Sequence, residues 1–126
     1  MTKHIIQTNN APAPIGPYNQ AVKAGNFLFV SGQVAIKPGT NELASADIIE
    51  ETHQVLQNLK AILTEAQMDF SNIVKTTIFL SDMALFSQVN EIYAKYFDGD
   101  FPARETVAVK GLPKNANVEI SVIATA

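Results

Sequence analysis

The 126-residue chain contains no cysteine and only two histidines. Without cysteine there can be no disulfide, no thiolate nucleophile and no cysteine-based zinc site. His4 and His53 lie far apart in the sequence and lack the spacing of metal ligands. We therefore expect no metal site, and several classes of enzyme centre are excluded.

Clusters of basic residues and long apolar runs are also missing. Nine lysines and arginines are scattered along a chain with twelve acidic residues, and the formal net charge is −3. Duplex nucleic acid is bound largely through clustered positive charge, so the composition argues against nucleic acid as a partner. The first residues lack the apolar core of a signal peptide, and no run could span a bilayer. We expect a cytoplasmic protein without a membrane partner.

The composition that remains is that of a globular protein. Hydrophobic residues make up 47% of the chain and charged residues 17%, a balance that disordered chains do not have. A chain of this length has the size of one domain and can bury a core. No repeat or linker divides it, so we expect residues 1–126 to form a single domain.

Hydrophobic spacing predicts two helices. The first should run from Asp47 to Ala66, with Asp47 and Glu50 resembling a capping box and an apolar stripe packed on the core. The second should begin at an Asp82 cap and continue to about Phe97. Its buried side should comprise Met83, Phe86, Val89, Tyr93 and Tyr96, while the first helix should expose Glu50, Glu51, Gln54, Gln57 and Lys60 to solvent.

Strands are expected on both sides of the helices. The second and third strands surround the pair Gly25-Asn26, which predicts a β-hairpin with a two-residue turn. The order of elements predicts an α+β fold, a two-layer sandwich of a mostly antiparallel sheet with two helices on one face. The expected strands are 3–8, 21–24, 27–31, 72–80, 104–109 and 118–124.

The second face of such a sheet would lack a cover. Two helices can cover only one face, and the last strand places the apolar Ile123 near Glu119 and Ser121. An exposed apolar face usually meets another subunit. We therefore expect an oligomer.

Arg104 and Glu119 are the residues of the last two strands that could carry chemistry. The planar guanidinium of Arg104 could bind a carboxylate through two parallel hydrogen bonds, although a surface or structural arginine is the alternative. Glu119 lies between apolar neighbours. It could face solvent, form an ion pair with a residue such as Arg104, or handle a water molecule, and the residues alone leave these open.

Several segments together resemble the RidA/YjgF family. Residues 102–113 (PARETVAVKGLP) followed by 118–120 (VEI) resemble its C-terminal signature, and residues 13–21 (APIGPYNQA) resemble its N-terminal loop. Residues 30–34 (VSGQV) are similar to the next segment, and residues 54–63 and 89–93 to its two helices. The resemblance covers essentially the whole chain in the right order, which is far more specific than any one motif.

The resemblance implies a fold like that of the small trimeric chorismate mutases and a homotrimer with clefts between subunits. It implies hydrolysis of enamines and imines, such as 2-aminoacrylate/2-iminopropanoate and 2-iminobutanoate, to 2-keto acids and ammonia without a metal or cofactor. Arg104 would hold the carboxylate of the small 2-imino acid, and Glu119 would position or activate water. Tyr18, Ser31, Gly32, Asn90 and the backbone at Thr106 would line the cleft.

Two other functions stay open at this point. The same cleft could belong to a non-catalytic regulator that binds a keto or amino acid, or to an endoribonuclease or translation inhibitor. Tyr18 could be no more than a packed loop residue, and Ser31-Gly32 no more than a strand end. Glu105 and Gln67 depart from the family pattern, Glu105 where a small residue is usual and Gln67 where glycine often ends the first helix. A second carboxylate at Glu105 raises the question of weakened activity.

Overall fold

A single six-stranded sheet forms the centre of the computed structural model, which describes residues 2–44 and 46–126. The strand order is β1-β2-β3-β6-β4-β5. Neighbouring strands pair antiparallel except for β4 and β5, which are parallel. The strands are β1 (Lys3–Ile6), β2 (Ala21–Ala24), β3 (Phe27–Gln33), β4 (Ile73–Leu80), β5 (Ala103–Ala108) and β6 (Val118–Thr125).

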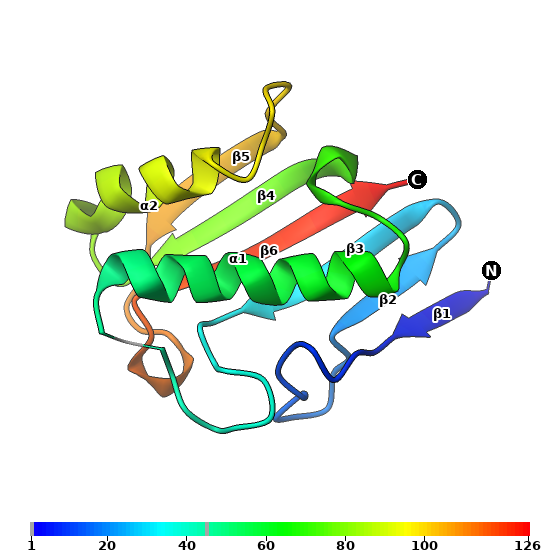
Figure 1. Ribbon diagram of the computed structural model, residues 1–126, viewed down its shortest axis with the longest axis horizontal. Coiled ribbons are helices and arrows are strands. Elements are labelled where there is room, and N and C mark those ends of the chain that lie inside the picture. The colour runs from blue at the N-terminus through cyan, green and yellow to red at the C-terminus, as the bar shows by residue number, and fades with distance from the viewer. Residues whose placement is uncertain (1, 45) are drawn as a thin grey trace.

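Two helices cover one face of this sheet (Figure 1). Helix α1 (Ile48–Glu65) crosses β3 and β6, and the shorter α2 (Phe86–Ala94) lies toward the β4–β5 side. The parallel pairing of β4 and β5 follows from α2, because parallel strands need a crossover connection. The expected two-layer α+β sandwich is therefore confirmed.

The core lies between the helices and the sheet. Helix α1 contributes a stripe of fully buried side chains at helical spacing, including Val55, Leu59 and Ile62, and the facing strands contribute Leu28 and Ile120. Burying one such side chain contributes about 1.5–3 kcal/mol. This packing, rather than helix propensity, holds α1 on the sheet.

The start of α1 agrees with the sequence in one respect and differs in another. The Asp47 carboxylate accepts a hydrogen bond from the backbone N–H of Glu50 at 2.7 Å, so Asp47 is the N-cap. The expectation that Glu51 faces solvent was wrong, since its side chain is 1% exposed. Glu51 lies four residues before Val55, at the border of the apolar stripe, and the end of the sheet covers it.

The second helix is shorter than its pattern predicts. Asp82 caps a 3₁₀ turn, Met83–Leu85, and the α-helix begins only at Phe86. It ends at Ala94, since the N–H groups of residues 95–97 bond three residues back in tightened turns. Met83 is 45% exposed, because it belongs to the preceding turn rather than to the buried side of α2.

The other face of the sheet carries exposed apolar side chains. Ile5, Phe29 and Ile123 are aligned across β1, β2, β3 and β6 through the strand register. Phe27, Phe29 and Val107 each expose between 43% and 48% of their surface. We call this surface, away from α1 and α2, the open face. None of the helices in residues 2–44 and 46–126 has the length and apolarity needed to cross a bilayer.

Candidate active site

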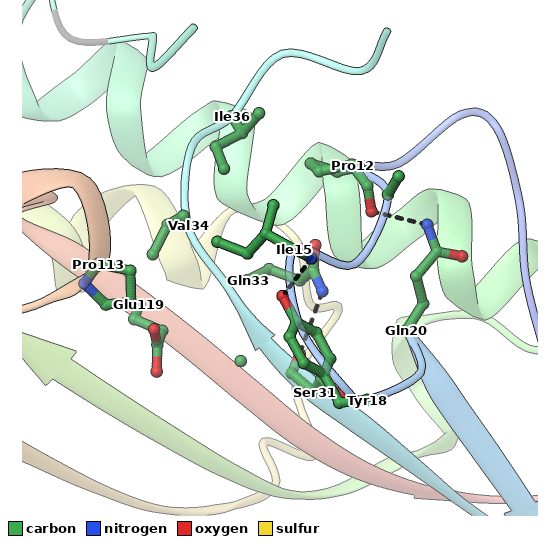
Figure 2. Close-up of a pocket in the computed structure, with 12 residues that line it drawn as sticks. Pro12, Ile15, Tyr18, Gln20, Ser31, Gln33, Val34, Ile36, Pro113 and Glu119 are labelled. Carbon is green, nitrogen blue, oxygen red and sulfur yellow. Dashed lines mark hydrogen bonds between the residues drawn. The ribbon is translucent and has the colours of Figure 1, made fainter. Parts of the chain in front are cut away.

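A cleft of about 420 Å³ lies at one end of the sheet, between the N-terminal loop and β6 (Figure 2). Figure 2 shows Glu119 on one side of this cleft and Tyr18 with Ser31 on the other. We call it the Glu119 cleft. Its wall is mostly apolar, and its lining comprises Pro12, Ala13, Ile15, Tyr18, Gln20, Ser31, Gly32, Gln33, Val34, Ile36, Pro113 and Glu119.

Glu119 supplies the carboxylate of this cleft. It alternates along β6 with the buried Val118 and Ile120, so its side chain leaves the helix-covered face. Burial raises the pKa of the Glu119 carboxyl above its usual value of 4.5. Within residues 2–44 and 46–126, no hydrogen bond or ion pair satisfies this carboxylate. A desolvated carboxylate facing a cavity is a group suited to accept and return a proton.

Gly32 lets the Glu119 carboxylate come close to β3. Between Val30 and Gln33, β3 advances three residues while β6 advances two, so Ser31 and Gly32 form a β-bulge. A Cβ atom on Gly32 would lie 2.6 Å from Oε1 of Glu119, closer than real contacts allow. The segment is therefore not a simple strand end, because its lack of a side chain makes room for Glu119.

Tyr18 reaches the cleft from a loop that Gln20 holds in place. The buried Gln20 amide donates to the carbonyls of Thr8 and Pro12, and its oxygen accepts the Thr8 N–H at 2.8 Å. The Tyr18 hydroxyl accepts the Ile15 N–H at 3.3 Å. Since that bond uses a lone pair, the hydroxyl proton can be donated to a ligand.

Ser31 lies in the bulge and fixes the loop to β3. Its N–H donates to the Gln20 carbonyl at 2.9 Å, and its hydroxyl donates to the Asn19 carbonyl at 2.6 Å. The hydroxyl oxygen keeps a lone pair with which it can accept a hydrogen bond. Tyr18, Ser31, Gly32 and Glu119 therefore line one cleft.

Arg104 lies in a second cleft, of about 580 Å³, on the helix side of the sheet. Its guanidinium carbon is 5.1 Å from the ring centre of Tyr93 and 5.8 Å from that of Phe86. Stacking on two rings orients the guanidinium plane, and its N–H groups remain able to bind an anion. We call this the Arg104 cleft; its lining comprises Ser87, Asn90, Glu91, Tyr93, Ala94, Phe101, Pro102 and Arg104.

The Tyr93 ring, which contacts the Arg104 guanidinium, is itself held in place by a hydrogen bond. Its hydroxyl donates to Oγ1 of Thr76 on β4 at 2.9 Å in a buried position. Burial raises the pKa of the Tyr93 phenol, which the bond to Thr76 and the charge of Arg104 oppose in part. Tyr93 therefore stays neutral, and its ring holds Arg104 while its hydroxyl ties α2 to the sheet.

Thr106 lies two residues after Arg104 on the edge strand β5. The N–H of Val109 donates to the Leu80 carbonyl of β4 at 2.8 Å. Because backbone groups alternate along a strand, the N–H of Thr106 points instead to the free edge. The buried side-chain hydroxyl of Thr106 has no hydrogen-bond partner within the described part of the chain. The backbone of Thr106 is thus free to bind a ligand or a neighbouring copy.

Arg104 and Glu119 lie on opposite faces of the sheet. Arg104 pairs with Thr76, which faces α2. Glu119 pairs with Phe79, three residues along the same strand and therefore on the other face. This arrangement rules out an Arg104–Glu119 ion pair within one chain. It also divides the predicted site residues between two clefts, with Asn90 on the Arg104 side.

Glu105 points away from Arg104, as strand alternation predicts. Its carboxylate forms an ion pair with Lys75 at 2.9 Å and accepts the Thr77 hydroxyl at 2.7 Å. The hydrogen bonds from Thr77 and Lys75 lower the pKa of the Glu105 carboxyl. Within one chain this second carboxylate is neutralised on the face opposite Arg104. No three His, Cys, Asp or Glu side chains of residues 2–44 and 46–126 come together as metal ligands.

Three buried polar residues were missed in the sequence; one lines the Glu119 cleft, and the other two form hydrogen bonds to lining residues or to their neighbours in the chain. Gln20 and Glu51 are described above, and Asn58 of α1 donates from its amide to the carbonyls of Val34 and Ile36 at 3.1 and 3.0 Å. Each is almost fully buried. Glu51 and Asn58 are seven residues apart and therefore lie on the same border of the apolar stripe of α1. This position was the signal in the sequence, because a polar side chain buried there needs a hydrogen-bond partner.

Comparisons with known proteins agree with this architecture. The profile described as endoribonuclease L-PSP matches residues 8–126. The chain is 49% identical to Reactive Intermediate Deaminase A of Arabidopsis thaliana over 98% of the chain and 66% of the relative. It is 47% identical to the 2-iminobutanoate/2-iminopropanoate deaminase of Mus musculus over 97% of the chain and 90% of the relative.

Solved structures share the fold at high similarity. A crystal structure from Thermotoga maritima superposes with a TM-score of 0.96 at 47% identity, covering 99% of this chain and 98% of that one. Sequence profile, relatives and fold agree over nearly the whole length. The chain belongs to the endoribonuclease L-PSP family, which is the RidA/YjgF family.

Proposed function

We propose that the protein hydrolyses 2-imino acids and their enamine tautomers, such as 2-iminopropanoate and 2-iminobutanoate, to 2-keto acids and ammonia. The observation that carries the proposal is Glu119, a partly buried carboxylate of raised pKa that faces a cavity beside the Tyr18 hydroxyl. A general base with a raised pKa transfers protons more effectively near neutral pH. The deaminase names of the plant and mouse relatives support the same reaction.

The complete site in this proposal is built from two copies of the chain in a homotrimer. Arg104 and Asn90 of one copy meet Glu119, Tyr18 and the Ser31-Gly32 bulge of the next. Support comes from the two clefts, which open on opposite faces of one sheet, so that one chain cannot apply both to one small substrate. The exposed apolar residues of the open face supply a surface for a closed ring of copies.

The residues have separate tasks in this reaction. The Arg104 guanidinium binds the substrate carboxylate through two hydrogen bonds. Water attacks the carbon of the protonated imine and gives one proton to Glu119, which forms the neutral carbinolamine. Glu119 returns that proton to the nitrogen, the C–N bond breaks as the C=O bond forms, and the carbinolamine hydroxyl proton passes to the departing ammonia. One iminium ion and one water give one keto acid and one ammonium ion. Orientation and proton transfer by one carboxylate are sufficient, so no cofactor is required.

Mixing two inactive variants tests this proposal directly. The imine is generated in the assay by an amino-acid oxidase or threonine dehydratase, and release of keto acid is followed. Arg104→Ala and Glu119→Gln should each lower kcat/KM by about 10²-fold or more. After subunit exchange in an equal mixture, about a quarter of the interfaces should carry both native residues and regain activity, by random assortment around a ring.

Each outcome of this experiment is informative. Recovered activity supports the shared site, and sedimentation of the unmixed protein should give a trimer. An active mixture requires both residues to act, whereas full activity of both single variants refutes the roles assigned to Arg104 and Glu119. A native protein that does not accelerate keto-acid release refutes the deaminase assignment. Tight binding of a keto acid without any turnover would instead identify a metabolite-binding regulator. Cleavage of RNA that persists through repeated purification would identify a ribonuclease.

A further inference from the structure

Glu51 is a buried carboxylate that none of the proposed chemistry uses. It lies in the first turn of α1 and exposes 1% of its surface. Burying a carboxylate is costly unless hydrogen bonds satisfy it. Within residues 2–44 and 46–126, the one ion pair is Lys75–Glu105, so hydrogen bonds rather than a cation satisfy Glu51.

Within the described part of the chain, all hydrogen bonds to the Glu51 carboxylate come from Asn117, which precedes β6, and from Val118, the first residue of β6. Oε2 accepts the Asn117 N–H at 2.7 Å and the Val118 N–H at 3.3 Å. Oε1 accepts the Asn117 side-chain amide at 3.0 Å. These three donors hold the chain in both position and direction, because two come from the backbone and one from a side chain.

Asn117 is also fixed from the opposite side. Its side-chain oxygen accepts the Ser81 hydroxyl at 2.8 Å, and its carbonyl accepts the Ser81 N–H at 3.0 Å. The start of β6 is thereby clamped between the first turn of α1 and the end of β4. Glu119 follows this clamp by only two residues.

The segment before Asn117 is neither α-helix nor strand, so it cannot fix the position of Glu119 through a regular hydrogen-bond pattern. It is a 3₁₀ turn, Pro113–Asn115, in which Lys114 and Asn115 both have left-handed backbone angles, with φ of 58° and 56°. Such conformations are unfavourable for side-chain-bearing residues and need surrounding contacts to persist. Pro113 of this turn lines the same cleft as Glu119.

From this geometry we infer that Glu51 is a positioning residue for Glu119. It acts through the peptide N–H groups of Asn117 and Val118 and sets where the Glu119 carboxylate stands in its cleft. The inference rests on the proposed function of Glu119. A carboxylate is needed here, because an amide in its place would turn an NH₂ group toward one or two of the donors.

The test is Glu51→Gln, with Glu50→Gln as the matched control. Glu50 is the preceding residue of α1 and is exposed, so the same chemical change there should alter nothing. We expect Glu51→Gln to lower kcat by about 10- to 100-fold, since small displacements of a catalytic group are that costly. KM should stay within about twofold, because carboxylate binding belongs to Arg104 on the other face.

A double-mutant cycle separates positioning from general damage to the fold. If Glu51 acts through Glu119, Glu51→Gln should cause no further loss of kcat in a Glu119→Gln background. The fall in Tm, about 5 to 10 °C for an unsatisfied buried donor, should be equal in both backgrounds. An equal loss of kcat in both backgrounds, or an unchanged kcat in Glu51→Gln, would overturn the inference.

Two further measurements keep the outcome decisive. The pH profile of kcat in Glu51→Gln should shift relative to wild type, since a displaced Glu119 carboxyl changes its degree of burial, and a smaller active fraction would not move that profile. If Glu51→Gln does not fold, Asn117→Ala keeps both backbone bonds and should give a smaller fall in kcat. A normal kcat in Glu119→Gln would refute the catalytic role of Glu119 in the proposed function. A lowered kcat in Glu119→Gln together with an unchanged kcat in Glu51→Gln would refute only the role of Glu51.

Discussion

Replacing Gly32 with alanine should lower activity strongly while leaving the fold intact. The added Cβ would lie 2.6 Å from Oε1 and 2.8 Å from Cδ of Glu119, whereas ordinary contacts begin near 3.4 Å. The carboxylate must therefore move by about 0.8 Å, and a displacement of about 1 Å costs about 10²-fold in rate. We expect kcat to fall by about 10- to 100-fold, equivalent to about 1.4–2.7 kcal/mol in the barrier.

The stability of this variant should change little. The clash involves the end of a flexible side chain rather than backbone, and Gly32 does not have a left-handed backbone. We expect a loss of about 1 kcal/mol or less in the free energy of unfolding, at the low end for overpacking. The measurements are steady-state deamination of an enzymatically generated imine and urea denaturation of the same samples.

Gly111 provides the matched control. A Cβ on Gly111 meets no atom within 4 Å, and its backbone angles also suit alanine. Gly111→Ala should therefore keep both activity and stability. Wild-type kcat in Gly32→Ala would refute the reasoning, and so would a loss of activity that merely follows unfolding.

Two further predictions concern stability. Glu119→Gln should raise Tm at neutral pH although it lowers activity, because ionisation of the desolvated Glu119 carboxyl opposes folding. This difference in Tm should vanish below pH 4.5, where the carboxyl is protonated in the folded and the unfolded state. Equal Tm values for the variant and the wild type at all pH would contradict the raised pKa of Glu119. Gln67→Gly should stabilise the protein by about 1 kcal/mol in urea denaturation, since Gln67 follows the C-cap of α1 with a φ of 60°. Lys60→Gly, within the same helix, should instead cost about 1 kcal/mol, and stabilisation by both would refute the role of φ.

The backbone at Gln67 has the conformation that the family pattern, with glycine often ending the first helix, leads one to expect. The N–H of Gln67 donates to the Thr64 carbonyl and that of Met68 to the Leu63 carbonyl, which is the Schellman arrangement that favours glycine. The pattern of apolar residues likewise predicted α1, the Gly25-Asn26 hairpin and the strands within a few residues. Such features depend on neighbours in the chain, so the sequence carries them directly.

The candidate site was predictable only as a set of residues. Motifs singled out Tyr18, Ser31, Gly32, Asn90, Arg104, Thr106 and Glu119, but they treated Arg104 and Glu119 as parts of one local motif. The structure separates them, because β4 lies between β5 and β6 and the register puts Thr76 and Phe79 on opposite faces. Register between strands distant in sequence is set by packing of the whole sheet, which no local pattern encodes.

The sequence by itself determined the periodicity of the helices and strands and the two-layer arrangement in which two helices cover one face of the sheet. The tertiary structure alone decided that β6 inserts between β3 and β4 and that Gly32 meets Glu119 across a bulge. It also decided that Glu51, expected in solvent, is buried against Asn117. The physical reason is common to all three: each depends on contacts between residues far apart in the chain, whose geometry is fixed only when the core packs.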